Sequence, residues 1–232
     1  MAWREVDLVV DGGVVLTADS EWNTYDPGAV AVDGGTIVAV GPRQEVDRAY
    51  RGREWIDASS KLVMPGLLNA HTHAPMTLFR GIADDVPLET WLHEYIWPAE
   101  AKWVTPDFVR LGTQLAAAEM IRSGTVLFCD MYFFQDEVAQ VCKNVGLRVV
   151  IGEGLVDFPN PDYKTSEEGL QRNEYLLQRW KDDPLVVPSI QPHSPYAASA
   201  ELMQRAKELA DEYSAPYLLH VSETQKEVQA VS

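Results

Sequence analysis

The sequence has little cysteine, few basic side chains and no long apolar run. Its two cysteines, Cys129 and Cys142, lack the spacing of a metal-binding or redox pair, so we expect reduced thiols in a cytoplasmic protein. Lysine and arginine total 19 against 35 acidic residues, and the net charge of -16 would repel nucleic acids and anionic membranes. No apolar run approaches the ~18 residues of a membrane span, and charged residues occupy the start, where a signal peptide needs an apolar stretch. We therefore expect neither nucleic acid nor membrane as a partner.

The first part of the chain, residues 1–63, has the pattern of a small antiparallel sheet. Short β-rich pieces such as 29–32 and 37–40 are separated by turn signals, and Asp-Gly-Gly occurs at 11–13 and at 33–35. Because glycine reaches a positive φ at little cost, each Asp-Gly-Gly is predicted to form a hairpin turn.

The second part, residues 64–232, alternates apolar strands with amphipathic helices, which indicates a parallel sheet. Strands are predicted at 66–71, 125–131, 148–155, 185–192 and 216–221, and helices near 107–123, 135–145, 166–181, 199–213 and from about 223 onward. Five β/α units do not close a barrel of eight. We therefore expect an open sheet, a fragment, or one half of a split protein.

Two histidines follow the first of these strands. His71 and His73 are two residues apart, and alternate residues of a strand project to the same face, so both imidazoles can point to one spot. Two neutral imidazoles suit zinc or another borderline divalent ion. Such a pair also arises by chance on a surface, but its place at the end of an apolar strand favours half of a metal site.

A third histidine, His220, ends the fifth predicted strand, and Glu223 follows three residues later. One interpretation is a core histidine followed by a capping box, since Ser222 and Glu223 are good helix-start residues. The other makes His220 a metal ligand and Glu223 the general acid/base beside the metal. A helix can begin here under either interpretation.

The two remaining histidines differ in their surroundings. His193 lies beyond the fourth predicted strand between Pro192 and Pro195, and a stiff loop suits an imidazole that contacts substrate. The alternative is a loop histidine bonded to backbone. His93 is expected on a helix surface.

Taken together, these motifs resemble the amidohydrolase superfamily, and in particular the branch of 5'-methylthioadenosine/S-adenosylhomocysteine deaminases and their chlorohydrolase relatives. The resemblance is carried by Pro-Gly-Leu-Leu-Asn-Ala-His-Thr-His-Ala-Pro-Met at 65–76 and by the segments at 78–81, 91–92, 97–100, 193–196 and 220–224. It implies an α/β fold, a (β/α)8 barrel whose strands one to five lie in residues 64–232. Residues 1–63 would supply part of an antiparallel β-sandwich.

The resemblance also implies a single zinc, with iron or manganese as other options, held by His71, His73, His220 and an aspartate. Glu223 would be the proton shuttle. The aspartate and a further histidine would follow Ser232, so the remaining part of the barrel is an expected partner, and a homo-oligomer is another.

Substrate residues are implied in the same way. Trp91 and Glu100 match positions that line a nucleoside pocket, where a carboxylate can accept both hydroxyls of a ribose. Their alternatives are a core tryptophan and a helix-surface glutamate. In some relatives that take S-adenosylhomocysteine an arginine stands where Glu153 stands here, and a glutamate would repel the amino-acid carboxylate, unless Arg172 compensates.

The implied activity is zinc-dependent hydrolytic deamination of an adenine nucleoside to the inosine analogue and ammonia. The substrate would be 5'-methylthioadenosine, S-adenosylhomocysteine or adenosine. One alternative is a related hydrolase acting on a triazine or guanine ring. The other is a non-catalytic truncated fragment that needs a partner chain.

Overall fold

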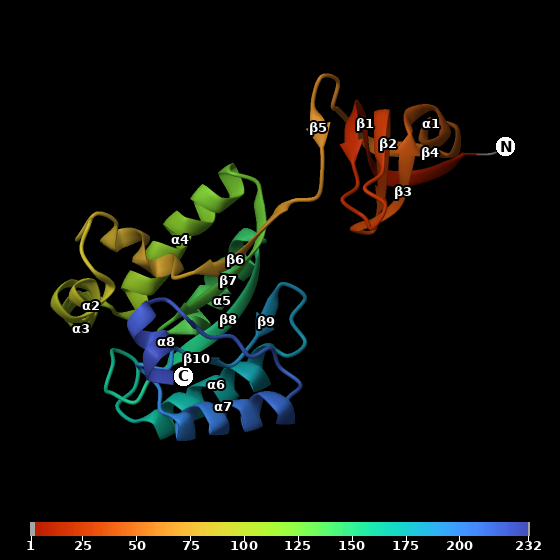
Figure 1. The fold of residues 1–232 in the computed structure, drawn as a ribbon. Helices are drawn as coiled ribbons and strands as arrows, with labels where there is room; N and C mark the ends of the chain where they lie inside the picture. The colour runs from red at the N-terminus through yellow and green to blue at the C-terminus, as the bar shows by residue number, and fades with distance from the viewer. Residues whose placement is uncertain (1–2, 232) are drawn as a thin grey trace. The chain divides into compact units, whose positions relative to one another are not determined.

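A computed structural model describes residues 3–231, which form two compact units, one ending at Gly66 and the other beginning at Leu67 (Figure 1). Within these residues we find no helix that is both long enough and apolar enough to cross a membrane. Each unit is described by itself.

The first unit is a sheet in the order β3-β2-β1-β4, with β5 paired to β1. Its elements are β1 (Arg4–Leu16), β2 (Thr24–Asp33), β3 (Thr36–Pro42), α1 (Arg43–Ala49), β4 (Tyr50–Asp57) and β5 (Leu62–Val63). β1 and β3 are antiparallel to β2, whereas β4 and β5 run parallel to β1. The sheet is therefore mixed and not purely antiparallel as predicted, because α1 carries the chain across before β4 begins.

One of the two predicted hairpin turns is wrong. At Asp33-Gly34-Gly35 the hairpin forms, with φ of 57° at Gly34 and 75° at Gly35, and Asp33 pairs with Thr36. At 11–13, however, β1 continues without turning, and its register against β2 shifts between Asp11 and Gly13. The glycines there form a β-bulge, because β1 is paired on both edges and one extra residue is accommodated within the strand.

The second unit is built on a parallel sheet in the order β10-β8-β7-β6, with β9 also paired to β8. Its strands are β6 (Leu67–Thr72), β7 (Thr125–Tyr132), β8 (Arg148–Leu155), β9 (Val186–Pro188) and β10 (Gln191–Pro192). Its helices are α2 (Leu88–Thr90), α3 (Trp97–Trp103), α4 (Pro106–Arg122), α5 (Gln135–Val145), α6 (Ser166–Trp180), α7 (Ala200–Glu212) and α8 (Gln225–Val231), together with a 3₁₀ turn at Ala74–Phe79 and a π-helical turn at Trp91–Ile96.

The long helices begin at side chains that cap them. The hydroxyls of Thr105, Thr165 and Ser199 each accept a hydrogen bond from a backbone N–H in the first turn of α4, α6 and α7. α5 ends at Gly146, whose φ of 77° is the left-handed conformation that glycine adopts easily. These local signals place the helices where the sequence predicts them.

The fourth and fifth predicted strands differ from expectation. The stretch predicted at 185–192 is divided into β9 and β10, and the stretch predicted at 216–221 forms only a bridge from Tyr217 to Ile190. Its backbone nevertheless runs beside β10, because Leu218 N–H donates to Ile190 O and His220 N–H donates to His193 O. In the described residues no strand pairs with its other edge, so the ladder stays incomplete.

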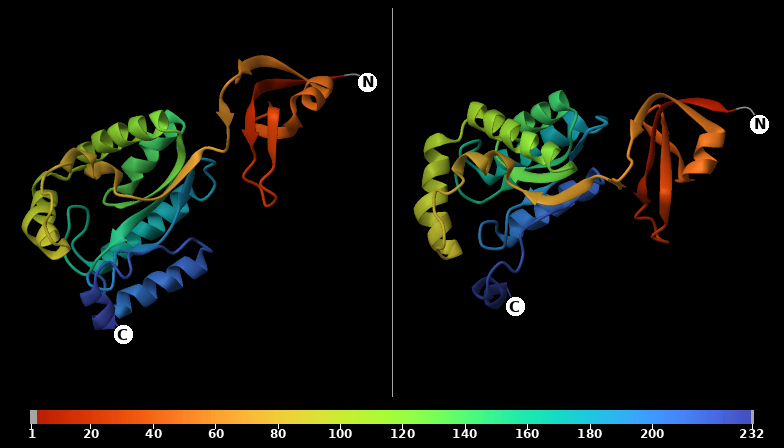
Figure 2. Two further views of the ribbon diagram at one scale, coloured as in Figure 1. Left: turned by 45° about the horizontal axis from the view of Figure 1, so that its top comes forward. Right: turned by 90° about the horizontal axis from the view of Figure 1, so that it is seen from above.

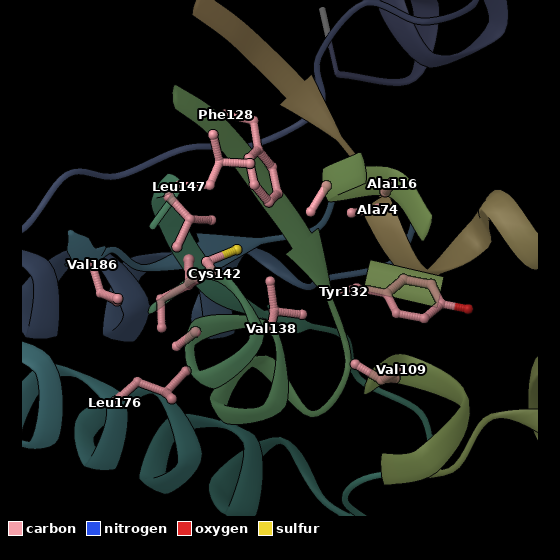
Figure 3. Close-up of a cluster of buried hydrophobic side chains, with 14 of the residues drawn as sticks. Ala74, Val109, Ala116, Phe128, Tyr132, Val138, Cys142, Leu147, Leu176 and Val186 are labelled. Carbon is pink, nitrogen blue, oxygen red and sulfur yellow. The ribbon is translucent and has the colours of Figure 1, made fainter. Parts of the chain in front are cut away.

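The largest core lies between the sheet and the helices that cover it (Figures 2 and 3). Phe128, Val149 and Ile151 of the strands are fully buried against Val138 and Cys142 of α5. α4 packs on β7, α5 and α6 pack on β8, and α7 packs on β10, so the strand ends, with the residues that follow them, are held at one rim of this layer.

Candidate metal centre

Three histidines from distant parts of the chain meet at this rim. His71 and His73 come from the end of β6, and His220 comes from the extended segment that follows α7. One ring nitrogen of each lies within 4.8 Å of those of the others. Their ring centroids are 4.8 to 5.2 Å apart. The structure thus brings together the three predicted ligands.

Backbone carbonyls hold two of these rings. The Nδ1 of His73 lies 2.5 Å from Met131 O, and the Nδ1 of His220 lies 2.9 Å from His193 O. Because a carbonyl can only accept, each Nδ1 carries the proton and each Nε2 presents a lone pair. The two Nε2 atoms are 3.3 Å apart.

This arrangement fits a divalent metal. Two lone pairs facing each other at 3.3 Å repel, and a cation between them turns that repulsion into attraction. Tetrahedral zinc with Zn–N bonds of ~2.0–2.1 Å places two ligand nitrogens about 3.3 Å apart. The spacing of the His73 and His220 nitrogens therefore matches what the metal requires.

Burial favours the neutral form of His71, His73 and His193. It lowers the pKa of His73 to about 4 and that of His193 to about 3. It also lowers the pKa of His71, which is more exposed. A neutral ring is ready to bind a cation at pH 7 without first losing a proton.

A cavity of about 310 Å³ adjoins the histidines. His73, His193, His220 and Glu223 line one part of it. Apolar side chains make up most of the remainder, among them Leu88, Leu92, Ile96, Trp97, Val156 and Phe158. A largely apolar hollow with a few convergent polar groups is the usual form of a small-molecule site.

Glu100 is the second acidic group in this cavity. It is only 6% exposed, so the alternative of a helix-surface glutamate is wrong. Burial raises the pKa of Glu100 to about 7, an effect that the neighbouring Tyr132 hydroxyl offsets in part. Tyr132 is buried, and Figure 3 shows its hydroxyl pointing away from the labelled core side chains.

Trp91 and His193 also lie in the cavity wall, whereas His93 does not. Trp91 is half-buried in the π-helical turn. His193 stacks on His220 with centroids 4.7 Å apart, and its Nδ1 is 3.0 Å from the Ser194 hydroxyl, so its ring bonds a side chain and not backbone. His93 is exposed, as predicted, and its ring contacts the edge of Trp97.

Glu223 lines the cavity, and its carboxylate accepts a hydrogen bond of 2.6 Å from the Tyr196 hydroxyl. A helix does begin nearby, but Thr224 caps it by accepting from Glu227 N–H. The Glu227 carboxylate in turn accepts the N–H groups of Ser222 and Glu223, each at 2.9 Å. A capping box built on Ser222 and Glu223 is therefore wrong, and the Glu223 side chain is available to the site.

The model of the amidohydrolase family matches residues 62–232. This chain belongs to the amidohydrolase family. An imidazolonepropionase-like composite domain of bacteria also matches residues 28–52.

This amidohydrolase chain has two relatives that share one name. It is 48% identical to the 5-methylthioadenosine/S-adenosylhomocysteine deaminase of Syntrophobacter fumaroxidans, over 100% of this chain and 52% of that protein. It is 46% identical to deaminase 1 of the same name from Syntrophus aciditrophicus, over 97% and 51%. The chain thus spans about half the length of these relatives. The predicted resemblance to this branch is confirmed.

Solved structures confirm the fold. The crystal structure of an adenosine deaminase from Xanthomonas campestris with bound zinc superimposes with a TM-score of 0.95 and 39% identity, over 99% of this chain and 52% of that one. The triazine hydrolase of Arthrobacter aurescens superimposes with a TM-score of 0.85 and 20% identity, over 93% and 53%, which shows the fold alone. The amidohydrolase chain therefore carries part of the family's barrel.

The structure overturns one inference about the substrate. Glu153 is buried in β8, and its carboxylate accepts the N–H groups of Phe134 and Gln135 at 3.0 and 3.1 Å. Burial and the nearby Asp162 carboxyl raise the pKa of Glu153, and Arg172 pairs with Asp162 at 3.2 Å. Among the described residues neither Glu153 nor Arg172 lines the cavity. Glu153 is therefore no obstacle to a substrate carboxylate.

The sequence reasoning missed Asp130 in this amidohydrolase. It lies near the carboxyl end of the apolar strand β7, is fully buried, and accepts three hydrogen bonds with its carboxylate. Burial raises the pKa of Asp130 to about 6, and these bonds limit the rise. A single acidic residue within an otherwise apolar strand was the signal that could have found it.

Proposed function

We propose that this chain supplies the metal-binding half of a zinc-dependent hydrolase that deaminates an adenine nucleoside. The supporting observation is the juxtaposition of the three histidines with a cavity that contains Glu223 at one end and the buried Glu100 elsewhere in its wall. The names of the relatives agree with this proposal.

His71, His73 and His220 would hold the metal through their ring nitrogens, and the remaining part of the barrel would complete the ligand set. A bound divalent metal supplies Lewis acidity and brings the pKa of a water toward neutrality. Imidazole is an uncharged ligand when it binds through a ring nitrogen, so these side chains would leave the cation most of its charge.

Glu223 would move the proton. Its carboxylate takes a proton from the attacking water and delivers it to a ring nitrogen of the purine, as oxygen adds to C6. The proton left on the added oxygen would then pass through Glu223 to the amino group, so that a C6 carbonyl forms, the C6–N bond breaks and ammonia leaves. Tyr196, which donates to Glu223, holds the carboxylate toward the cavity.

Glu100 would bind the sugar. Its carboxylate, when ionised, can accept both hydroxyls of a vicinal diol, and Trp91 and the other apolar side chains would pack against the flat base. His193, stacked on His220, would contact the base beside the reacting carbon. Because the Glu100 carboxylate can accept hydrogen bonds from two hydroxyls, the cavity favours a nucleoside over a triazine or guanine, which carry no ribose.

The test compares substrates directly. Ultraviolet absorbance would follow adenosine, 5'-methylthioadenosine, S-adenosylhomocysteine, guanine and a triazine with zinc-loaded protein that includes the remaining barrel. We expect turnover of the nucleosides, with a raised KM in Glu100→Gln. Preferential turnover of guanine or the triazine would replace the proposal with the second activity, and no turnover by zinc-loaded protein would favour a non-catalytic role.

Exposed apolar residues at the edges of the sheet in the second unit support the remaining part of the barrel as a partner. Leu67 and Leu68 of β6 are 50% and 70% exposed, and Val221 is 58% exposed. Apolar strand residues at that exposure need a covering segment. The remaining part of the barrel, on the same chain or in a homo-oligomer, would cover them, and we propose a cytoplasmic location for the assembled protein.

A further inference from the structure

The pairing of β6 with β7 is irregular beside His71 and His73. β6 pairs with β7 at Asn69 opposite Phe128 and next at Thr72 opposite Asp130, so two residues of β6 face one of β7. Such a bulge bends the strand and interrupts its ladder. Regular strand pairing therefore does not by itself place the turn that bears the two histidines.

The Asp130 carboxylate holds the segment in which the strand pairing is interrupted. Its Oδ1 accepts the Thr72 hydroxyl at 2.8 Å and the Ala74 N–H at 2.5 Å. Its Oδ2 accepts the Gln135 amide at 2.7 Å. Thr72 and Ala74 flank His73 in the chain, so one fully buried carboxylate holds both neighbours of a metal-binding residue.

Met131, the next residue of β7, also binds His73. Met131 O accepts from the Nδ1 of His73, which fixes the ring as well as the backbone. The Asp130 carbonyl itself accepts from the Gln191 side chain at 3.0 Å, which joins β7 to the β10 segment. His73 is thus held by the Asp130 carboxylate and the Met131 carbonyl of β7, and the Asp130 carbonyl in turn is bonded to Gln191 of β10.

We propose that Asp130 is a positioning residue that sets the metal affinity of the site by holding the turn from His71 to Ala74. The inference rests on the proposed metal-dependent function. Because Asp130 acts through backbone and hydroxyl contacts, its effect follows from which bonds a substitute can make. Removing a partner of this kind from around a metal ligand typically lowers affinity ~10–100-fold.

Three variants test the proposal. Asp130→Ala removes all three bonds. Asp130→Asn keeps an oxygen for Thr72 and Ala74, and its new NH2 can donate to the Gln135 Oε1, which has no partner now. Thr72→Val removes one donor while keeping the side-chain shape, so it serves if Asp130→Ala does not fold. Val138→Ala is the control, since it weakens the same core from α5 and removes no hydrogen bond to the turn.

Zinc affinity would be measured by competition with a chromogenic chelator, and the unfolding temperature by circular dichroism. We expect the affinity to fall ~10–100-fold in Asp130→Ala, to fall less in Thr72→Val, and to be retained in Asp130→Asn and Val138→Ala. Wild-type affinity in both Asp130→Ala and Thr72→Val would overturn the positioning role. An equal loss in Val138→Ala would also overturn it, because the effect would then be general destabilisation.

These outcomes are independent of the proposed reaction. Wild-type protein that binds zinc but deaminates no nucleoside would remove the proposed function and leave the Asp130 result standing. Full deamination with unchanged affinity in the Asp130→Ala and Thr72→Val variants would do the reverse.

Discussion

At the scale of single residues, the site depends on carboxylates in contrasting surroundings. Glu223 is exposed and held by one hydroxyl, whereas Glu100 and Asp130 are buried. We propose that Glu223 transfers a proton and that Glu100 binds a polar ligand, whereas Asp130 accepts a hydrogen bond from the backbone N–H of Ala74. The histidine cluster was predictable because i, i+2 spacing at a strand end is a local signal. Asp130 and Tyr196 were not, because each acts on a partner that only folding brings close.

Glu223→Gln should keep zinc and lose turnover. The amide has nearly the same shape but cannot take a proton, and a general acid/base contributes typically ~10²–10⁴-fold to the rate. Metal content by atomic absorption and kcat on adenosine check this together. A variant with wild-type kcat would remove Glu223 from proton transfer.

Glu100 should make stability depend on pH. Its pKa of about 7 in the folded chain lies above the ordinary 4.5, so the folded state binds the proton more tightly. The stability that this proton provides is full below about pH 4.5 and is lost as pH rises through about 7, a change of about 3 kcal/mol. Urea unfolding at pH 5 and pH 8 should show a smaller difference for Glu100→Gln than for wild type. Equal differences would contradict the buried ionisation.

At the scale of elements, the sequence predicts the helices more accurately than the pairing of the strands. α4 to α7 lie within a residue or two of their predicted bounds, because caps such as Thr105 and Gly146 act within one turn. The bulge at Gly12 and the loose segment at 216–221 were mispredicted, because pairing across strands decides them. An Asp-Gly-Gly sequence is compatible with a hairpin and with a bulge, and only the neighbouring strands select between them.

Thr105→Ala should destabilise the second unit by about 1 kcal/mol, because the first turn of α4 loses the acceptor for Phe108 N–H. Thr105→Ser keeps the hydroxyl and is the matched control. Urea midpoints at constant slope would measure the difference. If alanine and serine behave alike, the cap contributes nothing.

At the scale of the whole molecule, the metal would join parts of the second unit that lie far apart in the chain. Residues 71 and 73 precede the first long helix, and residue 220 follows the fourth. A ligand that binds only the folded state stabilises it by about 2.7 kcal/mol when present at a hundred times its Kd. For this size of protein that corresponds to a rise of roughly 5 to 10 °C in Tm.

Zinc should therefore raise the Tm of wild-type chain and leave that of His73→Ala nearly unchanged. Calorimetry with and without zinc gives the comparison, and magnesium serves as the control ion because it prefers oxygen ligands. An equal rise in His73→Ala would mean that zinc binds elsewhere.

His193 occupies two roles at once, since its ring lies in the cavity wall and its carbonyl holds the Nδ1 of His220. A ligand that orders His193 therefore also orders a metal-binding ring. Thermodynamic reciprocity then requires that whatever factor a bound nucleoside adds to the affinity for zinc, zinc adds to the affinity for the nucleoside. The centre and the cavity should fill cooperatively, so that an occupied site retains its metal against chelators that strip an empty one.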